Sequence, residues 1–215
     1  MHVATGAKRG RPATASRDDV FQAARRQYVA GERVDLTVVA ARLGLGRATI
    51  YRWFGSRERL LGEVIAVELE ALFAINRRAV RRRGVQGLLE VLDRINRSLT
   101  RSTALRRFLE QERAGAMRLL TSSTGVVQPR AVRCVNDLIT AEIAAGRYQP
   151  PADPETLAYA LIRLAEAFLY NDAATDIRGD HARLREVQAA LLGAERAARR
   201  PAGARGRRPG CDAGS

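Results

Sequence analysis

The sequence predicts an all-α protein with three short helices, one long helix and a helical remainder. Apolar residues recur at three- and four-residue spacing along most of residues 17–199, which is the period of a helix with one buried face. No segment alternates apolar and polar residues over the length of a strand, so we expect no strands. Clusters of Gly, Pro, Ser and Thr interrupt the pattern and mark where the helices end.

The three short helices are expected in the first quarter of the chain, at about residues 17–29, 36–43 and 46–53. Ser16 or Asp18 can cap the first helix and Asp35 the second, because these side chains accept hydrogen bonds from the open N–H groups of a helix. Gly44 can end the second helix in the left-handed conformation, which carries no steric penalty for glycine.

A long fourth helix is expected from Ser56 to about Arg83, spanning roughly 40 Å at about 1.5 Å per residue. It is long enough to connect the N-terminal helices mechanically to the part of the chain that follows. The remaining helices are expected at about residues 85–99, 103–120, 126–145, 154–171 and 181–199.

The second and third helices have the pattern of a helix-turn-helix. Their apolar residues are spaced so that two helices joined by a tight turn share one small core. These residues are Val39, Ala40, Leu43, Leu45, Ile50 and Trp53. The third helix keeps Arg47, Thr49, Tyr51 and Arg52 as polar groups, which suits a recognition helix in a DNA major groove. A helix–Gly–helix corner also occurs in proteins without a nucleic-acid partner, so the distribution of charge has to be weighed with it.

Basic residues gather at the two ends of the chain. Residues 1–60 carry 12 Lys and Arg against 5 Asp and Glu, residues 61–195 carry 19 against 17, and residues 196–215 carry 6 against 1. Positive charge concentrated in this way is suited to phosphate contact. Arg9 and Arg11 flank Gly10 in a short arm that either lies in a narrow minor groove or is only a charged terminus. The similar run at residues 205–209 is interpreted as a solubilising tail.

Composition argues against catalysis and metal binding. His2 and His181 are the only histidines, and Cys134 and Cys211 stand far apart, so a metal site, a Ser/His/Asp triad or a redox motif lacks its residues. We expect no cofactor and no catalytic residue. With no signal peptide and no apolar run near eighteen residues, the protein is expected to be cytoplasmic and to have no membrane partner.

Five motifs along residues 17–61 together resemble the TetR family of bacterial transcriptional regulators. They are Tyr28 with Gly31, Val39-Ala40, Leu43-Gly44-Leu45, Thr49-Ile50-Tyr51-Arg52-Trp53-Phe54 and Ser56-Arg57-Glu58-Arg59-Leu60. The wording of residues 47–53 and 55–64 is most similar to the QsdR-type branch. After residue 61 the resemblance is limited to the number and length of the helices.

The chain also departs from the family pattern at four positions. Asp35 stands where a Thr commonly caps the second helix and contacts phosphate, and a carboxylate repels phosphate, which puts that contact in doubt. Gly46 replaces a usual Ser, Ala48 a frequent Gly and Arg57 a frequent Lys. The guanidinium of Arg57 can still bind a phosphate, and it can do so bidentately.

The resemblance and the positions together give a set of expected DNA contacts. Thr49, Tyr51, Trp53 and Arg57 are assigned mainly to phosphates, which fix the register of the protein on double-stranded DNA. Arg47 and Arg52 are assigned mainly to base edges. One such unit contacts few base pairs, so specific binding to a palindromic operator normally needs two units on a dyad.

The resemblance implies a homodimer formed by the last two long helices and a small-molecule effector bound among the central helices. The dimerisation stripe is predicted as Leu157, Leu161, Leu164, Phe168, Leu184, Val187 and Leu191, with packing inside one chain as the alternative. The candidate effector contacts are Phe73, Phe108, Met117, Asn136, Arg163 and Glu166, each of which is also an ordinary core or surface residue type. The effector itself is not identified by the sequence.

The predicted organisation is therefore a basic arm at residues 1–16, a helix-turn-helix DNA-binding domain at 17–61, a helical ligand-binding and dimerisation domain at 62–199, and a basic tail at 200–215. The predicted function is a homodimeric repressor that a small molecule releases from its operator. The alternatives are a minor-groove architectural protein that uses its arms and has no effector, and, with little support, a helical enzyme.

Overall fold

A computed structural model describes residues 15–170 and 180–194 of the chain, and the regular structure in those residues is entirely α-helical. The helices are α1 (Arg17–Val29), α2 (Leu36–Leu43), α3 (Arg47–Phe54), α4 (Arg57–Ala79), α5 (Gly84–Arg101), α6 (Thr103–Gln111), α7 (Arg113–Thr121), α8 (Val127–Ala144), α9 (Pro154–Tyr170) and α10 (His181–Leu191). The predicted fold class is confirmed. The N-terminal arm, the basic tail and the predicted end of the last helix lie outside the described residues.

The three N-terminal helices begin and end at the capping residues that the sequence indicates. Ser16 and Asp19 form a reciprocal capping box at the start of α1, and the Asp35 carboxylate accepts from the first N–H groups of α2. Gly44 ends α2 with φ 63°, in the left-handed region that favours glycine. The chain then turns within two residues, so that α2 and α3 pack against α1 through Val20, Val39 and Ile50.

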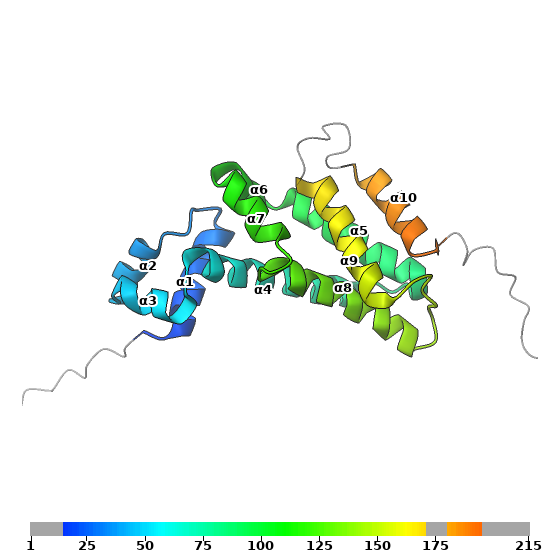
Figure 1. Cartoon of the computed structure of the whole chain (residues 1–215), viewed down its shortest axis with the longest axis horizontal. Coiled ribbons are helices and arrows are strands. Elements are labelled where there is room, and N and C mark those ends of the chain that lie inside the picture. The colour runs from blue at the N-terminus through cyan, green and yellow to red at the C-terminus, as the bar shows by residue number, and fades with distance from the viewer. Residues whose placement is uncertain (1–14, 171–179, 195–215) are drawn as a thin grey trace, which may run out of the picture.

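Helix α4 runs lengthwise through the molecule and connects its two ends (Figure 1). At about 1.5 Å per residue its 23 residues span roughly 35 Å. It packs on α1 and α3 among the N-terminal helices and on α5 and α8 in the rest of the molecule. Helices α8 and α9 make the most extensive helix pair of the remaining part, and α10 covers α5 and α9. Below, residues 17–61 are called the head and residues 62–194 the body.

The apolar core of the head does not stop at residue 61. One continuous cluster of buried side chains joins α1–α4 to Leu105, Phe108, Ala116 and Leu120 of α6 and α7. A second cluster fills the space between α4, α5, α8 and α9. The head therefore shares its core with the α6–α7 corner. A displacement of that corner would change the packing of the head.

Three predicted helices differ from the structure. The last one, expected over residues 181–199, ends at Leu191, because the chain turns at Leu192 and Gly193, and Gly193 has φ 67°.

The other two predicted helices differ for reasons that can also be identified. The fourth helix ends at Ala79, before the expected Arg83, because the backbone turns extended at Val80 and places that side chain in the second core at 2% exposure. The helix expected over residues 103–120 is two helices, interrupted at Glu112 with φ −138° and ψ 39°. The reason for this break lies in the contacts of the Glu112 carboxylate, described next.

Candidate DNA-binding surface and ligand chamber

Helix α3 buries one face and presents the other to solvent. Ile50 and Phe54 are buried against α1 and α4, whereas Arg47, Tyr51 and Arg52 are exposed. The Arg47 guanidinium lies 5.9 Å from the centre of the Tyr51 ring and donates to the Tyr51 hydroxyl at 3.5 Å, so the two side chains lie together. Residues 36–54 contain no acidic side chain. This exposed face is therefore positive and without a carboxylate that would repel phosphate.

The two other predicted α3 contacts lie at the edge of this face. Thr49 and Trp53 are half-buried, and Trp53 packs against the core of the head. No side chain caps the N-terminus of α3, because Gly46 occupies the capping position. The open N–H groups at the start of a helix are a suitable site for a phosphate oxygen. Arg9 and Arg11 of the predicted minor-groove arm lie outside the described residues.

Arg57, the last of the predicted DNA contacts, is engaged inside the protein. Its Nε donates to the backbone oxygen of Val34 at 2.6 Å, and its Nη1 donates to the Glu112 carboxylate at 2.8 Å. Its Nη2 forms a second hydrogen bond to the same carboxylate. The two side chains are each only 17% exposed. A bidentate pair of this kind fixes both partners in orientation, so Arg57 joins the start of α4 to the α6–α7 corner.

Glu112, at the point where α6 and α7 meet, pairs with two arginines of the head. Arg33, just before α2, also approaches this carboxylate, with Nε 3.3 Å from Oε1. The hydrogen bonds from Arg57 are the main reason that the pKa of Glu112 lies below its ordinary value. The break between α6 and α7 places the carboxylate where both arginines can reach it. We call Arg57, Arg33 and Glu112 the clamp.

Apolar contacts accompany the clamp. The Tyr28 ring of α1 meets the Phe108 ring of α6 edge-on, at 78° with centres 6.3 Å apart. Gly31, which ends α1 with φ 72°, lies directly under the Arg107 side chain of α6, so that a Cβ there would come within 2.7 Å of it. Helix α6 is thus fitted against the end of α1 by polar and apolar groups together.

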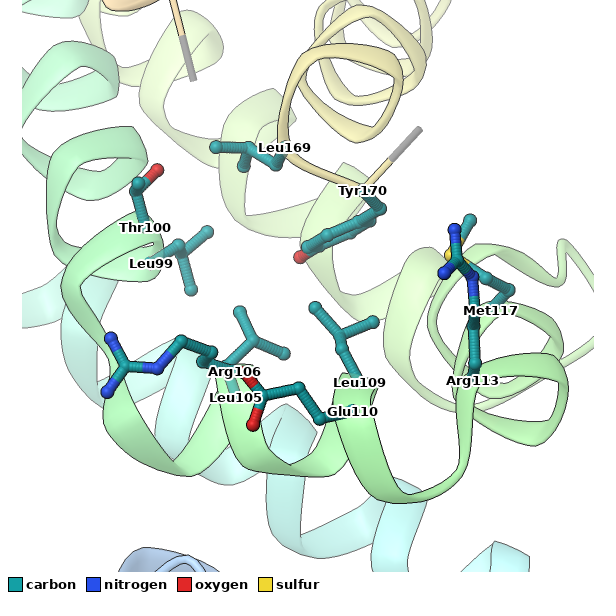
Figure 2. Close-up of a pocket in the computed structure, with 10 residues that line it drawn as sticks. All are labelled: Leu99, Thr100, Leu105, Arg106, Leu109, Glu110, Arg113, Met117, Leu169 and Tyr170. Atoms are coloured by element: carbon teal, nitrogen blue, oxygen red, sulfur yellow. The ribbon is translucent and has the colours of Figure 1, made fainter. Parts of the chain in front are cut away.

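Three neighbouring cavities lie among the helices behind this corner, and all three are lined by Leu99 and Tyr170. The outer cavity, about 310 Å³, lies between α6, α7 and the end of α9 (Figure 2). The head-side cavity, about 340 Å³, is bounded by α1, α4, α5 and α6. The inner cavity, about 40 Å³, lies between α4, α5, α8, α9 and α10. We call the three together the chamber.

The three cavities differ in polarity. The outer cavity is lined by Thr100, Arg106, Glu110 and Arg113 as well as Tyr170, whereas the inner cavity is lined mainly by apolar side chains. Figure 2 shows the Tyr170 ring crossing the outer cavity with its hydroxyl directed toward Leu99. Burial holds the pKa of that hydroxyl well above its ordinary value. In the inner cavity, Asn96 donates to the Gln188 side-chain oxygen at 3.3 Å, whereas the Gln188 Nε2 has no hydrogen-bond partner among the described residues. Glu166 lines the same cavity and is paired with Arg163 at 2.9 Å.

Three of the six predicted effector contacts line the chamber, and the other three do not. Phe73 and Glu166 line the inner cavity, and Met117 lines the outer one. Phe108 lies in the core against Tyr28, and Arg163 is exposed beside Tyr159. Asn136, on α8, lines none of the three cavities.

Tyr170, Asn96 and Gln188 were not among the predicted contacts. The sequence held a signal for two of them, because Asn96 follows Leu92 and Gln188 follows Leu184 at helical spacing. A polar side chain in the apolar register of a helix is therefore worth testing as a lining residue.

Part of the predicted dimerisation stripe lies inside the chain itself. Leu157, Leu161 and Leu184 are at most 4% exposed, and Phe168 is also buried. Leu164 and Leu191 are half-buried, and Val187 is exposed. The buried residues follow the alternative of packing within one chain, because a side chain already covered offers little area to a partner.

The described residues contain neither a metal-binding cluster nor a membrane-spanning helix. No group of three His, Cys, Asp or Glu side chains is placed to hold a metal ion in residues 15–170 and 180–194. Within the same ranges, no helix is long and apolar enough to cross a membrane.

Comparison with protein families matches residues 83–193 to the model described as the tetracyclin repressor-like C-terminal domain. These residues run from the start of α5 to just beyond α10, slightly more than half of the chain. A comparison with curated proteins found no match.

Solved structures show the same fold over most of the chain. The QsdR repressor of the TetR family from R. erythropolis is 29% identical, with a TM-score of 0.77 over 82% of this chain and 94% of that one. RolR, solved with resorcinol, is 19% identical with a TM-score of 0.60, covering 86% and 93% of the two chains. AlkX from Dietzia sp. is 23% identical with a TM-score of 0.57, covering 87% and 98%.

Proposed function

Because the chain belongs to the TetR family of transcriptional regulators, we propose that it is a homodimeric repressor that leaves a palindromic operator when a small molecule fills the chamber. The family establishes a DNA-binding transcriptional regulator. The dimer, the operator and release by a ligand are our proposal. The observation that supports it most is the exposed, acid-free face of α3, set on a head that shares its core with the walls of the chamber.

On the DNA, Arg47 and Arg52 are proposed to read base edges from the exposed face of α3. A bidentate arginine contact to guanine is worth about 1–3 kcal/mol of discrimination. Thr49, Tyr51 and Trp53 are proposed to bind phosphates along the same helix. Arg57 is reassigned, because its donors are engaged by Glu112 and Val34. We propose that it holds the head on the body and contributes no phosphate contact.

The proposed dimer surface is drawn from the exposed residues of α9 and α10. Tyr159 and Val187 are 45% and 41% exposed, which is high for large apolar side chains. Leu164 and Leu191 are half-buried beside them and can contribute part of their area. A two-fold arrangement of these helices would form a four-helix bundle and would place two heads on one face of the dimer.

Release by a ligand is proposed because the walls of the head-side cavity come from both the head and the body. The head-side cavity is lined by Tyr28 and Val29 of α1 and by Ile65 of α4, together with residues of α5 and α6. A molecule that fills this cavity therefore touches the head and the body at once. Coupling between two such sites is typically about 1–3 kcal/mol, which lowers operator occupancy roughly 5–150-fold.

The proposal is tested by selecting bound sequences from a random DNA library at about 150 mM salt, where non-specific phosphate binding is suppressed. A palindrome with half-sites about one helical turn apart supports the dimeric repressor. Enrichment of A·T-rich tracts without a palindrome would instead favour the architectural function, in which the N-terminal arm makes the main contact.

A further inference from the structure

The inner cavity contains one polar group whose chemistry is not used. Gln188 is 1% exposed, and its Oε1 is taken by Asn96 Nδ2 at 3.3 Å. Its Nε2 has no hydrogen-bond partner in the described residues. A buried donor without a partner has lost its hydrogen bonds to water, so a ligand group that accepts from it restores a hydrogen bond that the protein lacks. The chamber therefore offers one deep donor and selects for an acceptor.

The head-side cavity, which adjoins the inner one, is mainly apolar where a ligand body would lie. Leu69, Leu99 and Leu120 line both the inner and the head-side cavities, and Ile65, Leu72 and Leu105 extend the apolar wall toward the head. At about 340 Å³ the head-side cavity falls in the lower part of the range usual for small-molecule sites. A ligand of modest size can therefore lie with its apolar body there and with one end near Gln188.

Charge excludes two classes of ligand from the inner end. The inner cavity is lined by no Arg or Lys that could neutralise an anion, and Glu166 would repel one. A cation would need a free carboxylate, but Glu166 Oε2 is paired with Arg163 at 2.9 Å. An uncharged end group is the one that this environment favours.

We propose that the effector is an uncharged, mainly apolar molecule with a hydrogen-bond acceptor at one end, and that this acceptor binds Gln188 Nε2 while the apolar body lies against Leu69, Leu99 and Leu105. This inference rests on the proposed function for the site and adds the chemical class of its ligand. Ketones, esters and similar carbonyl compounds belong to this class. A carboxylate or an amine of the same length has no suitable partner at the inner end.

The test is calorimetric titration of the full-length protein, without DNA, with three compounds of equal chain length: methyl hexyl ketone, octanoate and octylammonium. We expect the ketone to bind at least tenfold more tightly than either ion. Equal or tighter binding of octanoate or octylammonium, or no binding of the ketone, overturns the inference. Because DNA is absent, the ranking does not depend on whether ligand binding releases an operator, so the two proposals fail separately.

Variants at Gln188 test whether its Nε2 is the atom that binds the ketone. Gln188→Leu removes the donor without adding a charge or a new O–H group, so the ketone should bind about tenfold more weakly. Gln188→Met removes the donor without adding charge and gives the same loss if the first variant does not fold. Gln22→Met is the control, because Gln22 is a half-buried glutamine of α1 that lines none of the three cavities, and it should leave the ketone affinity unchanged. Unchanged ketone affinity in both Gln188 variants overturns the inference.

Discussion

At the scale of single residues, arginines of the head are proposed to serve two separate roles, the reading of DNA and the attachment of the head to the body. The exposed arginines of α3 carry charge on a face without carboxylates. Arg57, at the first position of α4, directs the same kind of side chain inward to Glu112. Sequence alone could not separate these roles, because a basic residue at the start of a helix next to DNA suits either of them. The partner, Glu112, is 55 residues away in the chain.

The base-contact assignment predicts a specific loss for Arg52→Ala. Binding to the selected operator should weaken by about 1–3 kcal/mol and specificity should relax at one position, because a bidentate contact to a base edge is lost. Binding to random DNA should change little. The measurement is a fluorescence anisotropy titration on both DNAs. Arg42→Ala is the control. Arg42 is exposed on α2, and its loss should weaken binding to both DNAs alike. An equal loss on both DNAs for Arg52→Ala would mean that Arg52 contacts phosphate.

The clamp predicts a dependence of stability on pH. Because the folded-state pKa of Glu112 is lowered by the hydrogen bonds from Arg57, the ionised carboxylate adds stability above its ordinary value of 4.5. That contribution is lost as the pH falls through the lowered pKa. Glu112→Gln should therefore lower the free energy of unfolding by about 1–2 kcal/mol at neutral pH, and the difference from wild type should shrink in acid.

Urea unfolding at several pH values measures this difference. Glu110→Gln removes the same charge from an exposed position two residues away, and it should leave both the stability and its pH dependence unchanged. A Glu112→Gln curve that stays parallel to the wild type down to the acid limit would show that the carboxylate does not carry the effect.

At the scale of elements, the turn between α2 and α3 depends on one backbone conformation. Gly44 has φ 63° and Gly46 has φ −75°, and a Cβ at either position would meet nothing within 4 Å. Gly44→Ala should therefore lower stability by about 1–2 kcal/mol, because only the left-handed conformation is penalised. The melting temperature should fall by roughly 2–8 °C. Gly115→Ala is the matched control, because Gly115 lies inside α7, has no positive φ and would also meet nothing within 4 Å, so the melting temperature of that variant should not fall. A similar drop in both variants would show that lost flexibility, and not φ, matters.

The comparison of sequence and structure is also clearest at this scale. Helices α1–α3 could be predicted almost to the residue, because their limits are set by local groups: Ser16, Asp35 and Gly44. The break between α6 and α7 could not, because it is set by the distant arginines that bind Glu112. The end of α4 likewise depends on where Val80 is buried. Local signals predict what neighbouring residues decide, and tertiary contacts decide the rest.

At the scale of the whole molecule, the chamber and the dimer surface were the least predictable parts. A cavity forms where several helices fail to fill the space between them, and its lining comes from helices far apart in the sequence, such as Asn96 on α5 and Gln188 on α10. The same holds for the leucines of α9 and α10. Their helical spacing is that of a dimer stripe, yet three of them face the core of their own chain.

The dimer surface predicts that Val187→Asp separates the two chains. A charge at a site buried between two α10 helices would be desolvated without a partner, so the mass in sedimentation velocity should fall to that of one chain of 23.6 kDa. Val38→Asp is the control, since Val38 is 38% exposed on α2, outside the proposed surface. A dimer that persists in Val187→Asp would place the interface elsewhere.

The most direct test of the whole account is the number of chains bound to one selected operator, measured by native mass spectrometry against a half-site of equal length. For a dimeric repressor we expect two chains on the palindrome. Binding to the half-site should be at least a hundredfold weaker, because two heads on one dyad bind the DNA at the same time. One chain per palindrome with equal affinity for the half-site, or many chains spread along either DNA, would contradict it.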